Sequence, residues 1–147
     1  MTATVAFAIP KADRPEWIIQ KLTEMGVAQV VLLHCERSVV HWERDRAERH
    51  LDKLRRVAVE ALEQSRGVWL PVISGPLAAA DVLPGIAVAE PGGRTLTRHD
   101  DALAVGPEGG WSPSELALAA DRVALTATVL RVETAALVAG AMLTSRP

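Results

Sequence analysis

Cysteine, long apolar runs and positive net charge are scarce or absent in this 147-residue sequence. The single cysteine, Cys35, excludes an intramolecular disulfide framework and suits a reducing compartment. No run approaches the roughly eighteen apolar residues of a membrane span, and the N-terminus lacks the pattern of a signal peptide. With 16 basic and 18 acidic residues, the net charge of −2 does not attract nucleic acid to the molecule as a whole. We expect a soluble, cytoplasmic protein without a membrane partner, in which any nucleic acid is held by local patches.

The chain is long enough for one domain, which we assign to residues 1–147. Apolar runs at residues 5–9, 27–35, 86–90 and 102–106 predict buried strands. Between them, helices are predicted from Asp13 to Gly26 and over residues 46–65. The longer helix has apolar residues at three- and four-residue steps: Ala47, Leu51, Leu54, Ala58 and Ala61. This alternation predicts an α/β fold with a mainly parallel sheet covered by helices.

The remaining elements are shorter. Pro71 marks residues 68–73 as an edge strand, and a small helix is predicted from Leu77 through Asp81. Ser112, Pro113 and Glu115 form a strong helix start, so a helix is expected from Ser112 to about residue 120. Residues 122–130 predict a last strand or a pair of short strands, and residues 133–143 a final helix.

A glycine-rich loop, VGPEGGWSPSE (residues 105–115), follows one of the predicted strands. It is not a phosphate-binding P-loop, because no lysine occurs after Lys53. The glycine spacing also differs from the dinucleotide fingerprint, and Glu108 would face the pyrophosphate. A neutral or cationic ligand such as a sulfonium suits the loop better, since glycines let the backbone approach a ligand closely. A tight strand-to-helix connection without a ligand remains the alternative.

Two further motifs place charges at strand ends. In LRVETAA, Arg131 and Glu133 stand between an apolar strand and a helix start, where they form either a functional pair or a local cap. In ERSVV, Glu36 and Arg37 follow the second strand, and taken alone they read as a surface pair. The four histidines lack metal-ligand spacing, so we predict no metal site.

Taken together, five segments resemble the RsmE family of ribosomal RNA methyltransferases, part of the SPOUT class. They are PKADRPEWIIQKLTEMGV, ERSVVHW, EALEQSRGVWLP, AVGPEGGWSPSE and VLRVETAA, which cover nearly the whole chain in order. The resemblance implies methyl transfer from S-adenosylmethionine to N3 of a uridine in small-subunit (16S) ribosomal RNA. It also implies a homodimer and a C-terminal deep trefoil knot, one of the rare exceptions to unknotted topology.

The resemblance further implies roles for individual residues. Three segments are expected to bind the cofactor, through Ala89, Glu90, Pro91, Val105, Gly106, Pro107, Glu108, Gly109, Gly110, Leu125, Leu130, Arg131, Thr134 and Ala135. Arg131 is the candidate to stabilise the uridine anion, and Glu133 or Glu108 to accept its proton. The candidates for RNA phosphate contacts are Lys11, Arg14, Arg37 and Arg66. Trp111 adjoins the loop and is a candidate to flank the uridine.

Two departures from the family pattern keep other functions open. Members usually have an N-terminal RNA-binding domain, and this chain begins where that domain would end. Thr126 also stands after Leu125 where the family has glycine, and its side chain is expected to narrow the cofactor pocket. The alternative function is therefore a non-catalytic, dimeric knotted module that binds cofactor or RNA without methylating it. A related knotted enzyme acting on transfer RNA is a third candidate.

Overall fold

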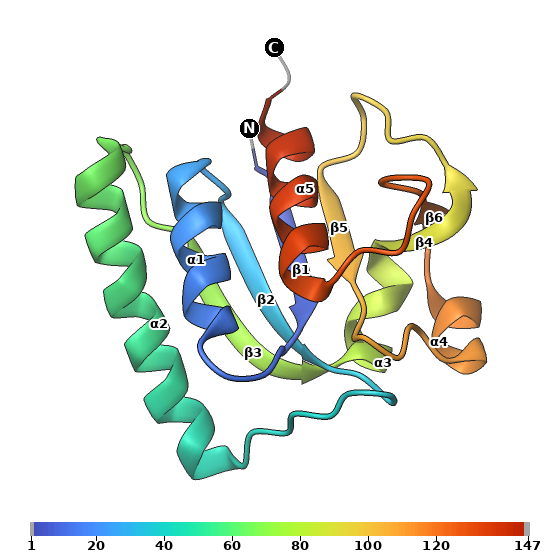
Figure 1. Cartoon of the computed structure of the whole chain (residues 1–147), viewed down its shortest axis with the longest axis horizontal. Coiled ribbons are helices and arrows are strands. Elements are labelled where there is room, and N and C mark those ends of the chain that lie inside the picture. Colours follow the sequence, from blue (N-terminus) through green and yellow to red (C-terminus); the bar gives the residue numbers. More distant parts are fainter. Residues whose placement is uncertain (1, 146–147) are drawn as a thin grey trace.

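A six-stranded sheet organises the chain in the computed structural model, which describes residues 2–145 (Figure 1). Every ladder among the described residues is parallel, and the strand order is β3-β2-β1-β5-β4-β6. The strands are β1 (Thr4–Ala8), β2 (Gln29–His34), β3 (Val72–Ala78), β4 (Ala87–Arg94), β5 (Ala102–Val105) and β6 (Asp121–Val123). The predicted α/β class with a mainly parallel sheet is confirmed.

Strand β1 lies between β2 and β5 because it is apolar on both faces. Val5, Ala6, Phe7 and Ala8 are all completely buried. Continuous apolar runs of this kind are typical of parallel strands that are covered by helices on both sides. The side chains of β1 therefore contribute to two separate cores, one on each face of the sheet.

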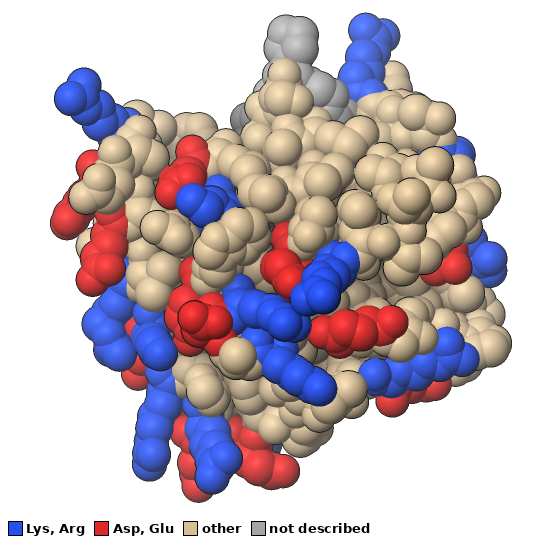
Figure 2. Space-filling view, viewed as in Figure 1, with Lys and Arg blue, Asp and Glu red and all other residues tan. Residues whose placement is uncertain are grey.

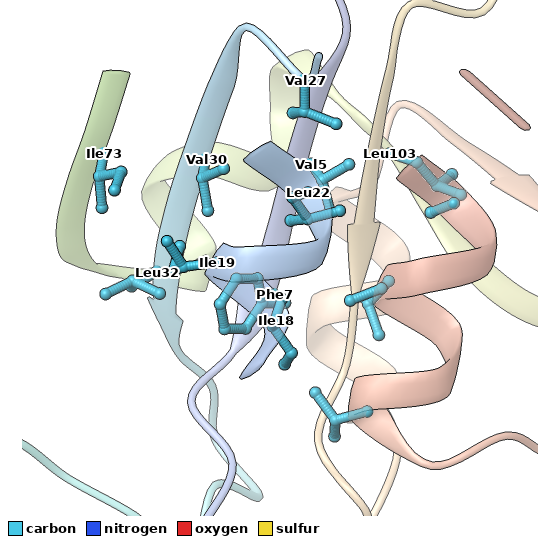
Figure 3. Close-up of a cluster of buried hydrophobic side chains, with 14 of the residues drawn as sticks. Val5, Phe7, Ile18, Ile19, Leu22, Val27, Val30, Leu32, Ile73 and Leu103 are labelled. Carbon is cyan, nitrogen blue, oxygen red and sulfur yellow. The ribbon is translucent and has the colours of Figure 1, made fainter. Parts of the chain in front are cut away.

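The larger core lies beneath α1 (Arg14–Glu24), α2 (Arg44–Ser65) and α5 (Val132–Thr144), which cover one face of the sheet (Figure 1). Figure 3 shows Phe7 of β1 beside Ile18 of α1, and Leu32 of β2 beside Ile19 of the same helix. The buried stripe of α2 is the one that the helical spacing predicts, formed by Ala47, Leu51, Leu54, Ala58 and Ala61.

The second core is thinner and lies under α3 (Ala79–Val82), the short 3₁₀ turn η1 (Leu83–Gly85) and α4 (Pro113–Leu118). On this face the central strands contribute small side chains, including Ala6, Ala8 and Ala104. Small residues let the covering segments approach the sheet closely. Trp111, just before α4, packs into this core and is only 4% exposed.

Strands β4 and β5 diverge toward their carboxyl ends. Their ladder pairs Ala87 with Leu103 and Val88 with Ala104 and goes no further. Beyond Val88, β4 stays alongside β6, where Arg94 is paired with Val123 after an irregular stretch. Crevices at the carboxyl ends of parallel strands are where ligands bind in open α/β sheets. The divergence therefore predicts a ligand site between the ends of β4 and β5.

The C-terminal segment returns from the edge of the sheet to its middle. β6 is the last strand of the sheet, whereas α5 contacts β1, β5 and α1. Residues 124–131 connect the two, mostly without regular secondary structure. Within residues 2–145, no helix combines the length and the apolar character needed to cross a bilayer.

The boundaries of four predicted elements differ from those in the structure. β3 begins after Pro71 and runs to Ala78, so Leu77 lies in a strand and the small helix starts at Ala79. β3 continues because Gly75, at φ +110° and without a side chain, lets the β3 backbone lie against Leu32 of β2. The register between β2 and β3 shifts at this point. The strand predicted over 122–130 is only three residues long, Asp121–Val123, and α4 ends at Leu118.

Candidate functional site

A pocket lies at the carboxyl edge of the sheet, where β4 and β5 diverge. Three segments line it: Ala89 to Pro91 at the end of β4, the glycine-rich loop after β5, and the connection before α5 together with the first part of that helix. The lining residues are Ala89, Glu90, Pro91, Val105, Gly106, Pro107, Glu108, Gly110, Trp111, Leu125, Thr126, Thr128, Val129, Leu130 and Ala135. Eleven of them are among the predicted cofactor residues, and their role in binding a ligand stays a prediction.

The other predicted cofactor residues lie outside the pocket lining. Gly109 faces Arg37 instead, with an added Cβ at 3.3 Å from the Arg37 Cβ. Arg131 is the exposed N-cap of α5, and Thr134 is exposed in its first turn. Thr126, which was expected to narrow the pocket, is in the lining, and the lining residues that the list of predicted cofactor residues lacked besides it are Trp111, Thr128 and Val129. The spacing of the last two carries no signal, because they belong to an irregular segment.

Trp111 joins two of the three segments. Its indole Nε1 donates a hydrogen bond to the Ala89 carbonyl at 3.0 Å. The same ring lies against Gly106, where an added Cβ would be 2.9 Å from Cε2. The ring is buried between the loop and β4, at 4% exposure, and the expectation that Trp111 flanks a substrate base stays a prediction. The ring forms part of the pocket wall and fixes the distance between the ends of β4 and β5.

Thr126, which stands where glycine was expected from the family pattern, lies on the pocket wall. Its hydroxyl donates a hydrogen bond to the Thr128 carbonyl at 2.8 Å. The threonine side chain is therefore satisfied within its own segment, as in other short side-chain-to-backbone turns.

The loop is fixed from behind by the start of α4. The Ser112 hydroxyl accepts a hydrogen bond from the Glu115 N–H at 3.2 Å, and Glu115 Oε1 accepts one from the Ser112 N–H at 2.9 Å. This is the capping box predicted from the sequence. Glu115 is only 2% exposed, and its Oε2 also accepts a hydrogen bond from the Glu36 N–H at 3.1 Å. The segment after β2 is thereby tied to α4.

Cys35 lies next to this arrangement and is buried. Burial, with a smaller contribution from the Glu115 carboxylate, raises the pKa of the Cys35 thiol to about 12. A thiol with so high a pKa is a poor nucleophile at neutral pH. Cys35 therefore belongs to the packing of the protein and not to its chemistry.

Arg131 and Glu133 do not pair with each other. Glu133 Oε1 lies 3.8 Å from Arg14 Nε of α1, and its Oε2 is buried without a hydrogen-bond partner. Among the described residues Arg131 forms no ion pair, so its guanidinium is available to a ligand. The arrangement does not support a role for Glu133 in orienting Arg131 directly.

The residues predicted to contact RNA phosphates lie partly at the carboxyl ends of the strands and partly at their amino ends. Lys11, Arg14 and Arg37 follow β1 or β2 and therefore lie at the carboxyl edge, near the pocket. Arg66 is the C-cap of α2, which precedes β3, and so lies toward the opposite edge. Figure 2 shows basic and acidic side chains gathered around the N-terminal ends of α1 and α5. Within residues 2–145, no three His, Cys, Asp or Glu side chains form a group that could hold a metal ion.

Comparison with known proteins places this pocket in a family. A family model described as an RNA methyltransferase domain matches residues 1–144. The chain belongs to this RNA methyltransferase family. Two relatives in it are ribosomal RNA small subunit methyltransferase E of Mycobacterium bovis and of Synechocystis. The first is 36% identical over an alignment of 170 residues, covering 97% of this chain and 64% of the relative. The second is 31% identical, covering 95% and 52%.

Solved structures of similar proteins have the same fold. Ribosomal RNA small subunit methyltransferase E from Neisseria gonorrhoeae, bound to S-adenosyl methionine, matches with a TM-score of 0.87 at 27% identity. This match covers 99% of our chain and 66% of that chain. The SpoU methyltransferase AviRb from Streptomyces viridochromogenes, at 14% identity and a TM-score of 0.60, shares the fold alone. The resemblance drawn from the five sequence segments is confirmed, and the chain spans about two thirds or less of these relatives.

Proposed function

We propose that this chain is the catalytic domain of an S-adenosylmethionine-dependent methyltransferase that modifies N3 of a uridine in small-subunit ribosomal RNA. The observation that carries the proposal is the pocket between the diverging ends of β4 and β5. It is lined by the three segments expected to bind the cofactor. Relatives named for methylation of small-subunit ribosomal RNA, one of them solved with S-adenosyl methionine, support the same function.

The chemistry of the pocket fits this cofactor. Leu125, Leu130 and Ala135 offer an apolar surface to an adenine ring, and Gly110, where an added Cβ would meet no atom within 4 Å, leaves its backbone open to polar groups. Glu90 and Glu108 supply negative charge that tolerates a sulfonium. When bound, S-adenosylmethionine supplies an activated methyl group, so the protein must provide alignment and a nucleophilic nitrogen.

The uridine must lose its N3 proton to become a good nucleophile. We assign the stabilisation of the resulting anion to Arg131, whose exposed guanidinium starts α5 directly after Leu130 of the pocket. A cation near the two carbonyl oxygens favours the deprotonated base. Glu133 is the proposed proton acceptor, with one oxygen facing Arg14 and the other unpartnered. Glu108 of the pocket wall is the alternative acceptor.

Replacement of Arg131 by alanine tests this assignment. Loss of a transition-state electrostatic contact is expected to lower kcat by about 10²-fold or more while leaving the Kd for S-adenosylmethionine nearly unchanged. Arg98, which is also exposed, provides the matched control as R98A. Normal methyl transfer by R131A would remove Arg131 from the mechanism.

The proposal includes a homodimer formed through α5. Leu137, Val138 and Ala141 of this helix are only partly buried in the single chain. Figure 2 shows few charged side chains on the surface over the outer part of α5. An uncharged, partly exposed helix face of this kind favours association. Light scattering on the purified chain should give twice the monomer mass.

The trefoil knot and the cytoplasmic location are parts of the same proposal. The return of residues 124–131 from the edge strand β6 to the middle of the sheet supports a threaded C-terminus. The non-catalytic module remains the second candidate, because Thr126 lies on the pocket wall where the family pattern has glycine. Calorimetry with S-adenosylmethionine, followed by a transfer assay on small subunits, separates the two functions. Binding without transfer favours the module.

A further inference from the structure

The segment after β2 reaches the glycine-rich loop through one side chain. Arg37 Nη1 donates hydrogen bonds to the Gly109 carbonyl at 3.1 Å and to the Trp111 carbonyl at 3.2 Å. Arg37 is more than 70 residues away from both in the sequence. We refer to these two contacts as the Arg37 bridge.

Two glycines make the Arg37 bridge possible. Gly110 has φ +78°, a conformation that favours glycine, and its N–H donates to the Pro107 carbonyl at 2.8 Å. This turn brings the carbonyls on either side of Gly110 within reach of one guanidinium. Gly109 lets the arginine stem lie against the backbone, since an added Cβ would be 3.3 Å from the Arg37 Cβ. Gly109 does not belong to the pocket lining, so its contact with Arg37 is separate from the pocket surface.

Neighbouring contacts support the Arg37 bridge. The Glu36 N–H donates to Glu115 Oε2, and the Ser114 hydroxyl donates to Glu36 Oε1 at 2.8 Å. Residues 36 and 37 are therefore held against both the loop and α4. On the other side of the same loop, Trp111 is bonded to Ala89 of β4. The loop is thus fixed to β4 by its tryptophan and to the segment after β2 by Arg37.

We infer that Arg37 is a positioning residue for the cofactor pocket, and that the ERS and GPEGGW motifs are two halves of one contact. The identity of the ligand in this inference rests on the proposed function, whereas the two hydrogen bonds of the Arg37 bridge do not depend on that function. Arg37 holds the carbonyls of Gly109 and Trp111 and thereby sets the position of Gly106 to Glu108 in the pocket wall. Its guanidinium is used within the protein and does not serve mainly as a contact for RNA phosphate.

The test compares R37M and R37K with R98M, which replaces an exposed arginine outside the site. Calorimetry without RNA should show that R37M raises the Kd for S-adenosylmethionine roughly three- to tenfold, with R37K between R37M and the wild type. R98M should match the wild type. In a salt titration of RNA binding, R37M should show the same slope of log K for RNA binding against log salt concentration as the wild type. A phosphate contact would instead lower that slope by about one.

Hydrogen exchange without any ligand tests the Arg37 bridge independently of the proposed function. Amides of residues 106–112 should exchange faster in R37M than in R98M, while β1 and β2 exchange as in the wild type. If the wild type binds no S-adenosylmethionine, the proposed function fails and the exchange data alone decide the inference. Equal exchange in R37M and R98M would overturn it, as would an unchanged cofactor Kd with a reduced salt slope. If R37M does not fold, the exchange rates and the cofactor Kd of R37K are compared with those of R98M instead.

Discussion

Gly106 offers the sharpest test of how the pocket is built. A Cβ at this position would lie 2.9 Å from Trp111 Cε2, 3.1 Å from Cδ2 and 3.2 Å from Nε1. The indole is rigid, buried and bonded to Ala89, so it cannot move away at little cost. G106A should therefore displace the ring and disturb the ends of both β4 and β5.

The expected magnitude follows from these contacts. Inserting one methyl group into a packed site costs about 1–3 kcal/mol. Weakening the hydrogen bond from Trp111 to Ala89 adds about 0.5–1.5 kcal/mol. With partial relaxation, a total of about 2 kcal/mol lowers Tm by roughly 4–8 °C in a chain of this size. If most of the displaced atoms belong to the pocket wall, the Kd for S-adenosylmethionine should rise by about tenfold.

Gly85 provides the matched control. An added Cβ there has no atom within 4 Å, so G85A should melt close to the wild type and bind the cofactor normally. A second variant, W111L, removes the ring atoms that meet the new methyl group. The effect of G106A should be smaller in the W111L background, which a double-mutant cycle measures. Thermal melting and calorimetry of G106A that match G85A would refute the proposed packing.

Two further predictions concern titratable groups, one of them buried and the other partly buried. Cys35, with its thiol pKa raised to about 12 by burial, should resist iodoacetamide at pH 8 in the folded protein and react fully in denaturant; mass spectrometry showing rapid native alkylation would contradict this. His34 Nε2 accepts a hydrogen bond from the backbone N–H of Trp42, and the His34 ring stacks on His41. Burial, and to a smaller extent the charge of His41, lowers the pKa of His34. Because the pKa of His34 is lower in the folded state, the unfolded state binds a proton at His34 at a higher pH than the folded state does. The unfolding free energy should therefore fall as the pH drops below about 6.5. Denaturant melts should show a shallower fall in H34Q than in the H99Q control, and equal slopes would count against the assignment.

The sequence alone was sufficient for much of the fold because local patterns determine it. The five apolar residues of α2 that recur at helical spacing, from Ala47 to Ala61, are all buried. Continuous apolar runs located β1, β2 and β5, since strands covered on both faces leave no other pattern. The end of β3 was misplaced because its continuation depends on Gly75 lying against β2, a contact between distant segments.

The candidate site was only partly predictable for the same reason. The glycine-rich loop was located because it follows a predicted strand, and strand ends meet at one edge of a parallel sheet, whereas the other two pocket segments were expected from the family resemblance. The burial of Trp111 depends on the space left by Gly106 and on the Ala89 carbonyl, neither of which a local pattern reveals. Likewise, Arg37 resembled a surface charge until the fold placed it beside the loop.

Methyl transfer is the most direct test of the central claim. The purified chain would be incubated with small ribosomal subunits lacking the modification and with S-adenosylmethionine labelled in the methyl group. We expect label in small-subunit RNA, located at N3 of a uridine by nuclease digestion and mass spectrometry, and lost in R131A. Tight cofactor binding with no label in RNA, or label at another position of the base, would contradict it.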